Sequence, residues 1–496
     1  MLRTVEHSCK LTEGHVDRLF RWRIFCPGTH KEQDRISASI CFMTSNQTGG
    51  TIDQPGVQQF EPSKLDVPRV SLFRARLHKC VQSTLCMVLV ALAIRLIVMG
   101  FLYKEQLDPD RDHWRFAYEN GRLARSIAEG RGLSSPLFGD TGVSAWMTPI
   151  YPYFVAGVFK LFGIYSTTSA FVLLIFQAVI SALTCLPIYY FAKKLFGLRA
   201  AVWSGWAWAF FPYGIYFPVE RIWGTWLSAL LMSLLLLIIL YLEKSPNVWL
   251  WIGYGLLWGF AALTEPVVMS AWPFMTGWAA YRLYRKKARW AIPLAASALA
   301  LIMFVTPWFI RNYRAFGRFV PFRDTLGLEL HVGNSGDTFH WHPRMIGPWH
   351  NDQEWKAFQD LGELAYMERE KQRGLEFIRS HPEWFAVMTV RRFAYVWTGF
   401  WSFDKRYLAE EPLDPPNVIF CTALTVMMLV GLRRLWRENR ELATFFALLL
   451  FFFPLVFYVT HTEVYVRRQI DPPILVLAVY GLVGRASGSG EPMAEN

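Results

Sequence analysis

The chain has 496 residues, of which 53% are hydrophobic and only 18% are charged, and it contains 22 Trp and 39 Phe. A soluble domain of this length cannot bury so much apolar surface, so the composition excludes a water-soluble globular protein and indicates a lipid environment. The formal net charge of +12 does not indicate a nucleic-acid partner. The Lys and Arg residues stand in short clusters beside apolar stretches, where they orient a membrane protein.

Residues 1–80 are polar and rich in turn-forming residues, without a sustained helical or strand period. We interpret them as a disordered cytoplasmic tail, and Met43 and Met87 offer alternative starts of the chain. Four of the seven cysteines lie here and three lie in apolar stretches, so we expect neither a disulfide framework nor a thiolate metal site. The cysteines are Cys9, Cys26, Cys41, Cys80, Cys86, Cys185 and Cys421.

The first membrane span is predicted at about residues 81–103. Basic residues precede it, so the positive-inside rule places its start in the cytoplasm. Later apolar stretches approach or exceed about 18 residues, enough for a helix to cross the hydrocarbon layer. They predict nine more spans, near 167–190, 201–218, 222–242, 248–264, 266–283, 290–310, 416–432, 441–460 and 472–485. Every turn that this assignment places inside is basic, and the short tail at 486–496 is then cytoplasmic.

Two segments on the predicted outer side are too long to be simple turns. The first outer loop, 104–165, belongs to a membrane domain at 81–310 and contains a helical run at 114–129. The second, 311–415, is predicted to form a small α/β domain, with a strand-like start at 318–331 and a helix at 353–380. Within it, 384–401 is predicted as an interfacial amphipathic helix, and the last spans occupy 416–485. The expected fold class is an α-helical polytopic membrane protein with about ten transmembrane helices and a small α/β outer domain.

Candidate site residues converge on the predicted outer side. They are the carboxylates Asp108, Asp110, Asp112, Glu119, Glu220 and Glu265, and the cationic residues Arg311, Arg314, Arg467 and Arg468. Such a set suits a site that deprotonates a hydroxyl group while it holds an anion, as glycosyl transfer from a lipid phosphate requires. A general base takes the proton of the attacking hydroxyl, and guanidinium groups stabilise the departing phosphate. Asp112 and Glu119 are seven residues apart, which places them on one face of a helix.

Structural roles stay open for these residues. Asp108 and Asp110 lie in a fully polar stretch where water can solvate them. Glu119 is flanked by basic residues at the spacing of a surface ion-pair helix. Glu220 can form an ion pair at the membrane edge, and Glu265 can sit in a wet cavity, although ionisable groups at membrane depth are functional by default.

Other basic residues have similar alternatives. Arg311 and Arg314 can anchor the seventh span, yet they lie outside, against the positive-inside bias. Arg95, inside the first span, is expected to pair with a carboxylate or to snorkel. The histidines of the second outer segment lack the spacing of a zinc site, so no metal ligand is assigned, and the need for a divalent cation stays open. These histidines are His331, His340, His342, His350 and His381.

Four short runs carry a family resemblance: YENGRLARSIAEGRG at 118–132, TPIYPY at 148–153, FKLFG at 159–163 and WFIRNY at 308–313. They resemble bacterial glycosyltransferases of the dolichyl-phosphate-mannose-protein mannosyltransferase type, within the C-fold superfamily. The resemblance extends over about residues 82–485. It implies an inverting transferase that takes its sugar from a polyprenyl phosphate and uses an acid of the first outer loop as base.

The resemblance also assigns individual residues. Glu119 matches the acid of the family, while Tyr118 stands where the usual acidic pair begins, so Asp112 or Glu220 can share the task. Arg467 matches the second Arg of a phosphate-contacting motif before the last span, whereas Tyr465 and Gln469 depart from that motif. The residues assigned to substrate binding are Arg311, Arg314, Arg467, Arg468, Glu265 and Tyr151.

The function expected on these grounds is sugar transfer from a polyprenyl-phosphate donor to a glycan, lipid or protein acceptor at the outer face of a bacterial cytoplasmic membrane. This step would belong to protein glycosylation or to cell-envelope assembly, and no cofactor is assigned. One alternative is a lipid or sugar transporter or flippase, which would show paired halves, and the sequence contains no internal repeat. Another alternative is a non-catalytic lipid-binding membrane subunit.

Overall fold

The computed structural model describes residues 79–107, 110–336, 346–349, 351–401, 414–461 and 466–484, without the side chains of 110, 111 and 414–416. All of them lie within the compact unit Asp66–Asn496. Almost the whole predicted tail at 1–80 lies outside the described residues, as do Asp108 and Tyr465. Within the described ranges, the regular structure is helical, and one isolated bridge joins Ser134 to Val143.

All ten apolar stretches predicted to be spans are helical. The corresponding helices are α2 (Thr84–Leu102), α6 (Thr167–Leu183), α7 (Cys185–Phe196), α8 (Leu198–Ala209), α9 (Pro212–Glu220), α10 (Thr225–Leu242), α11 (Val248–Thr264), η2 (Pro266–Ala271), α12 (Trp272–Arg285), α13 (Ala291–Phe316), α19 (Asp414–Glu438), α20 (Arg440–Phe452), α21 (Leu455–Val459) and α22 (Asp471–Val483). Five helical stretches of the described chain are long and apolar enough to cross a membrane: Thr84–Leu107, Thr167–Phe196, Thr225–Leu242, Ala291–Phe316 and Asn417–Glu438. The protein is therefore polytopic, and the full count of ten spans stays a prediction.

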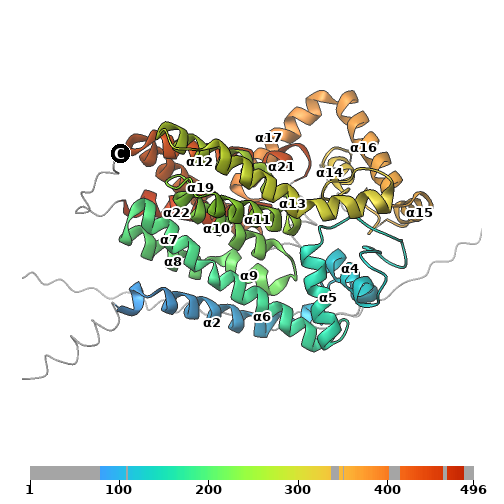
Figure 1. Ribbon diagram of the computed structural model, residues 1–496. Coiled ribbons are helices and arrows are strands. Elements are labelled where there is room, and N and C mark those ends of the chain that lie inside the picture. The colour runs from blue at the N-terminus through green and yellow to red at the C-terminus, as the bar shows by residue number, and fades with distance from the viewer. Residues whose placement is uncertain are drawn as a thin grey trace, which may run out of the picture. The chain divides into compact units, whose positions relative to one another are not determined.

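The two long outer segments are also helical. The first contains η1 (Tyr103–Leu107), α3 (Asp110–His113), α4 (Tyr118–Ala128) and α5 (Ile150–Phe162). The second contains α14 (Leu326–Gly333), α15 (Asp352–Leu361), α16 (Glu363–Ser380) and α17 (Pro382–Thr398). Figure 1 shows α4, α5 and α14 to α16 at the end of the helical bundle that is opposite to the C-terminus. The two segments thus share one end of the protein, as the predicted topology requires.

The α/β prediction for residues 311–415 is wrong over the part that the structure describes. The strand-like stretch at 318–331 ends in α14, because this helix packs against α16, where Gly327 approaches the Met367 carbonyl too closely to admit a Cβ atom. The helix predicted at 353–380 is confirmed, with a break at Gly362 between α15 and α16. Side-chain alternation in a short segment does not decide between strand and helix when another helix supplies the packing partner.

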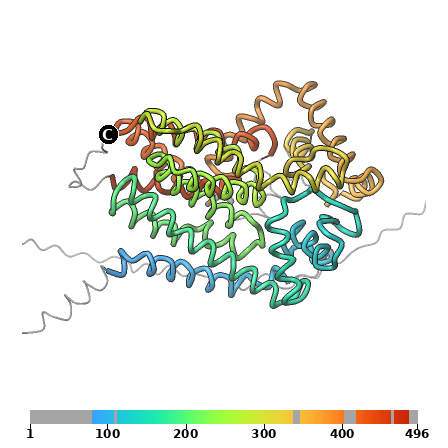
Figure 2. Tube along the Cα trace, viewed as in Figure 1, coloured from blue at the N-terminus to red at the C-terminus, as the bar shows by residue number. Residues whose placement is uncertain are grey.

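Glycines allow the closest contacts between the long helices. Figure 2 shows α11 and α13 running beside each other, and a Cβ atom at Gly255 would lie only 2.1 Å from the Ser297 carbonyl oxygen. Between α19 and α22, a Cβ atom at Gly431 would lie 1.9 Å from the Leu477 carbonyl oxygen. Small residues that permit backbone contact are the usual source of helix association in lipid, where burial of apolar side chains adds little.

The third predicted span is broken into α8 and α9, and Arg95 stabilises the break. Pro212 has no N–H for the carbonyl four residues earlier, so α8 ends at Ala209. The Arg95 guanidinium donates to the carbonyls of Trp208 (3.3 Å) and Ala209 (3.2 Å), and its Nε donates to Ser181 (2.9 Å). Arg95 is fully buried, so it neither snorkels nor pairs with a carboxylate as expected. Instead, it donates to main-chain groups exposed where the helix ends.

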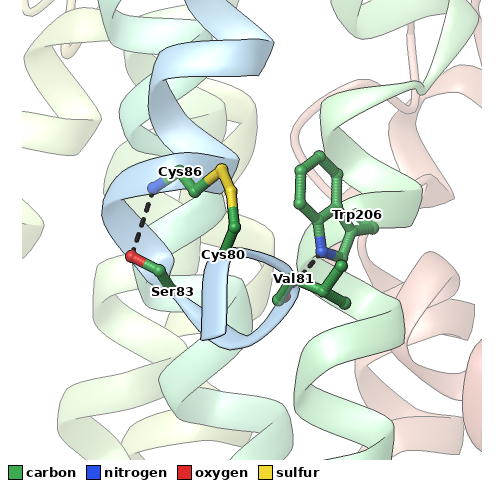
Figure 3. The surroundings of a disulfide bond; sticks show 5 residues. All are labelled: Cys80, Val81, Ser83, Cys86 and Trp206. Atoms are coloured by element: carbon green, nitrogen blue, oxygen red, sulfur yellow. Dashed lines mark hydrogen bonds between the residues drawn. A yellow bond between two sulfur atoms is a disulfide. The ribbon is translucent and has the colours of Figure 1, made fainter. Parts of the chain in front are cut away.

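The absence of disulfides predicted from the sequence is wrong at the start of α2. Cys80 and Cys86 are bonded, with Cα atoms 5.8 Å apart, as Figure 3 shows. Ser83 caps α2 between them, and its hydroxyl oxygen accepts a hydrogen bond from the Cys86 N–H (3.4 Å). The chain turns at this cap, and the turn brings the two thiols within bonding reach.

Candidate active site

A small pocket opens beside the turn that joins α9 to α10. Its lining residues are Phe217, Arg221, Trp223, Thr225, Trp226 and Arg468. Two guanidinium groups, from parts of the chain far apart in sequence, therefore face the same pocket as three aromatic rings. The lining therefore combines guanidinium groups, which bind phosphate oxygens, with aromatic rings, which accept apolar chains.

Arg468 and its neighbour Arg467 have different surroundings. Arg468 is buried, donates to Asp471 (2.7 Å) and stacks its guanidinium 3.5 Å from the centroid of the Tyr213 ring. Arg467 is also buried, but it donates to the carbonyls of Val396 (3.1 Å) and Trp397 and pairs with Asp471 (3.2 Å). Asp471 at the start of α22 thus binds both arginines, and of the two only Arg468 lines the pocket.

Glu220 lies at the last position of α9, directly before the pocket turn. Its carboxylate is largely buried and accepts from the Arg221 Nε at 2.8 Å. The Gln106 amide donates to the Glu220 carbonyl and ties η1 to the same turn. Glu220 is therefore an ion-pair partner that orients one pocket arginine, in agreement with the ion-pair alternative considered from the sequence.

The first outer loop brings Tyr118, the neighbour of Glu119, to this turn. The Tyr118 ring contacts the Trp223 ring, with centroids 5.6 Å apart, and the Arg221 guanidinium lies 5.9 Å from the Tyr118 ring centroid. Burial raises the pKa of Tyr118, while Arg221 opposes this rise and the charges of Glu220 and Glu119 add to it. Both carboxylates therefore lie within electrostatic range of one phenol, although they are far apart in sequence.

The backbone before Glu119 adopts an uncommon conformation. Asp112, His113, Ala117 and Tyr118 all have positive φ angles, between 52° and 64°. Residues other than glycine rarely adopt positive φ angles, and backbone strain of this kind is concentrated at functional sites. These residues also interrupt the predicted helix at 114–129, which begins only at Tyr118.

Asp112 does not share a helix face with Glu119, so that prediction is wrong. Asp112 lies in α3 and pairs with Arg122 (3.0 Å) and Arg125 (3.1 Å) of α4. Partial burial favours the neutral acid, but the hydrogen bonds and charges of the two arginines prevail and lower the pKa of Asp112. This carboxylate therefore holds the loop together, and it is a poor candidate for a base. Asp110 also lies in α3, and its side chain is not among the described ones.

Arg311 anchors the first outer loop to α13. Its guanidinium donates to the carbonyls of Ser144 (2.7 Å) and Leu133 (2.8 Å) and to the side chain of Asn312 (2.9 Å). Arg314, one helical turn later, is exposed. Neither residue lines the pocket, so the structure does not bring them together with Arg468.

Glu265 lies between α11 and η2, where its carboxylate pairs with Arg323 at 3.6 Å. Burial raises its pKa, and the Arg323 charge opposes the rise. Tyr151 is buried in α5 and donates to Gln177 at 2.9 Å. Neither residue lines the pocket.

Of the six pocket-lining residues, only Arg468 was selected from the sequence. Arg221, Trp223 and the buried Gln177, which binds the main chain of the pocket turn, were not selected. The sequence signal that could have identified Gln177 is an amide side chain inside an apolar span, because an amide is costly in lipid unless hydrogen bonds satisfy it.

The described residues contain no group of three or more His, Cys, Asp or Glu side chains that could hold a metal ion. His331 pairs with Glu370 at 2.5 Å, and His381 contacts the Phe377 ring. His340, His342 and His350 lie outside the described residues.

The fold and the pocket together define a polytopic helical membrane protein with a cationic, aromatic pocket near the end that carries its long outer segments. The family of dolichyl-phosphate-mannose-protein mannosyltransferases matches residues 147–310 of this chain. The resemblance inferred from the sequence is confirmed over this stretch, which contains Tyr151, Gln177, Glu220, Arg221 and Glu265. No curated protein sequence matches the chain.

Several solved structures are remotely similar. The oligosaccharyltransferase of Archaeoglobus fulgidus, in a complex with Zn and sulfate, is 12% identical with a TM-score of 0.44, and the match covers 80% of this chain and 48% of that one. The archaeal oligosaccharyltransferase AglB from Archaeoglobus fulgidus, in complex with an inhibitory peptide and a dolichol-phosphate, is 12% identical with a TM-score of 0.46, over 80% and 50%. ArnT from Cupriavidus metallidurans, bound to undecaprenyl phosphate, is 15% identical with a TM-score of 0.35, over 80% and 77%. The chain spans about half the length of the archaeal structures.

Proposed function

We propose that this protein is a glycosyltransferase that moves a sugar from a polyprenyl-phosphate donor to an acceptor at the outer face of the bacterial cytoplasmic membrane. The observation that carries the proposal is the pocket that Arg221 and Arg468 both line, beside the turn that Tyr118, the neighbour of Glu119, contacts. The match of residues 147–310 to the mannosyltransferase family supports it independently.

The proposed reaction is a single displacement with inversion at the anomeric carbon. The Glu119 carboxylate takes the proton of the acceptor hydroxyl, whose oxygen forms the new bond to the anomeric carbon. The bond between that carbon and the phosphate oxygen breaks, and its electron pair leaves on the polyprenyl phosphate. Arg221 and Arg468 stabilise the charge of this leaving group. Asp471 and the Tyr213 ring hold Arg468 in place, and Glu220 orients Arg221.

A flippase is the alternative from another class, since it also uses ionisable groups at membrane depth. Arg95 is such a group beside a broken helix. Its three guanidinium nitrogens, however, donate to one hydroxyl and three main-chain carbonyls. It is therefore occupied in stabilising the fold, which favours the transferase.

The decisive experiment is a profile of lipid-linked sugars in a strain that lacks this protein, followed by assay of purified protein with the lipid that accumulates. We expect one polyprenyl-phosphate sugar to accumulate, and its sugar to be transferred, which would also identify the donor. If no such lipid accumulates, and the purified protein moves polyprenyl phosphates across vesicle membranes without any transfer, the protein is a flippase.

A further inference from the structure

Gln177 is a buried amide in the middle of an apolar helix. It lies on α6 within the membrane-spanning stretch Thr167–Phe196, and its exposed fraction is 2%. An amide group in such surroundings destabilises the protein unless hydrogen bonds replace those it loses to water. Its partners therefore show what the residue does.

All four hydrogen-bonding positions of the Gln177 amide are occupied. Its oxygen accepts from the Tyr151 hydroxyl (2.9 Å) and from the Trp223 N–H (2.8 Å). Its nitrogen donates to the carbonyls of Pro218 (2.8 Å) and Arg221 (2.9 Å). The orientation of the amide is unambiguous, because the main-chain N–H can only donate and the two carbonyls can only accept.

These partners surround the pocket turn. Pro218 lies near the end of α9, and Arg221 and Trp223 belong to the non-helical residues between α9 and α10. Tyr151 packs on the far side of the same turn, where a Cβ atom at Gly224 would come within 3.2 Å of its ring. One side chain of α6 therefore binds both main-chain ends of the segment that presents Arg221 and Trp223 to the pocket.

Ser181, one helical turn further along α6, makes a comparable bond away from the pocket. Its hydroxyl donates to the Gly214 carbonyl at 2.8 Å. This carbonyl lacks its usual helical donor, because the residue four positions later is Pro218, which has no N–H. Ser181 thus joins the same two helices as Gln177 without contact to the pocket turn, which makes it a matched control.

We propose that Gln177 is a positioning residue of the donor site: it fixes the turn 221–224 so that the Arg221 guanidinium and the Trp223 ring face the polyprenyl phosphate. The inference rests on the proposed function, and it assigns to α6 a role in donor affinity. A hydrocarbon side chain at this position would leave two carbonyls and one N–H of the turn without partners, so the turn would move to find others.

The test uses the full-length protein in lipid nanodiscs with undecaprenyl phosphate as the probe. Gln177→Leu and Ser181→Ala are compared with the unmodified protein by the dissociation constant of the probe and by thermal unfolding. We expect both variants to unfold at lower temperature. Gln177→Leu should weaken binding by about tenfold or more, the factor that corresponds to the loss of about one hydrogen bond to a charged group, and Ser181→Ala should leave binding unchanged.

Equal losses of affinity in the two variants would overturn the proposal, because Gln177 would then act only through general stability. An unchanged affinity in Gln177→Leu would overturn it as well. If Gln177→Leu does not fold, Tyr151→Phe replaces it, because this change removes one of the four hydrogen bonds of Gln177. Tyr151→Phe should weaken binding of the probe by about threefold, while Ser181→Ala should leave that binding unchanged. If the unmodified protein does not bind undecaprenyl phosphate, the proposed function itself fails and the positioning role fails with it.

Discussion

The guanidinium of Arg468 lies over the Tyr213 ring, with its Cζ 3.5 Å from the ring centroid. Stacking of this kind is worth about 2 kcal/mol where water is excluded, and the ion pair with Asp471 adds a second restraint (2.7 Å). Arg468 is thus held in one orientation before any ligand arrives. A preorganised cation stabilises a charged leaving group more effectively than a mobile one.

Arg468→Lys should therefore weaken the enzyme although it retains the charge. A lysine has neither the flat guanidinium that stacks on Tyr213 nor the fork that binds two phosphate oxygens. We expect the KM for the lipid donor to rise by roughly tenfold or more. Steady-state kinetics with the native donor measures this, and Arg433→Lys at an exposed position of α19 serves as the control. An unchanged KM would remove Arg468 from the donor site.

Glu119 and Glu220 should differ in kinetic effect. Glu119→Gln removes the proposed base, so kcat should fall by about 10²–10⁴ with little change in KM. Glu220→Gln instead weakens the ion pair that orients Arg221 (2.8 Å), so the donor KM should rise more than kcat falls. If Glu220→Gln abolishes kcat while Glu119→Gln has little effect, the two roles are exchanged.

Arg311→Ala should act on stability. Two of the three hydrogen bonds of this guanidinium connect α13 to the first outer loop, and their loss leaves two main-chain carbonyls without those donors. We expect a destabilisation of about 2 kcal/mol or more, measured by thermal unfolding, with normal donor affinity in the protein that remains folded. Arg314→Ala, at the exposed site one turn later, should change neither quantity. A loss of affinity in Arg311→Ala without a loss of stability would return Arg311 to the donor site.

Glu363 should make the stability of the outer segments depend on pH. Burial, together with the Asp324 carboxyl beside it, raises the pKa of Glu363 well above its usual value, and its Oε1 accepts from the Ala145 N–H at 2.6 Å. A folded pKa above the unfolded one means that the folded state retains a proton that the unfolded state releases. The stability is therefore fully present below the unfolded pKa of about 4.5, and it is lost as the pH rises through the folded pKa.

Thermal unfolding of the purified protein across acidic to alkaline pH measures this effect. The unfolding temperature of the unmodified protein should fall as the pH rises. Glu363→Gln keeps an acceptor for Ala145 and cannot ionise, so its curve should be flatter, while the exposed Glu376→Gln should follow the unmodified protein. Parallel curves for Glu363→Gln and the unmodified protein would show that this carboxyl does not titrate between the folded and unfolded states.

Much of the fold could be predicted from local pattern. The ten apolar stretches are helical, because a backbone in lipid must satisfy its hydrogen bonds within each segment. The sequence does not reveal that Arg95 stabilises the break between α8 and α9, since Arg95 and the carbonyls of Trp208 and Ala209 are more than 100 residues apart. The strand predicted at 318–331 failed for a similar reason: the α16 surface that supports α14 is distant in sequence.

The sequence by itself determined residence in the membrane and the helical class. Composition and local charge carry that information. Only the tertiary structure decided which of these charges meet. Arg467 and Arg468 are adjacent in the chain, yet a turn directs one toward main-chain carbonyls and the other into the pocket. From the sequence, Asp112, Arg311 and Glu119 are all charged residues on the predicted outer side. The ion pairs of Asp112 and the hydrogen bonds of Arg311 in the structure indicate structural roles for these two residues. Partner choice depends on packing between distant helices, which no local pattern records.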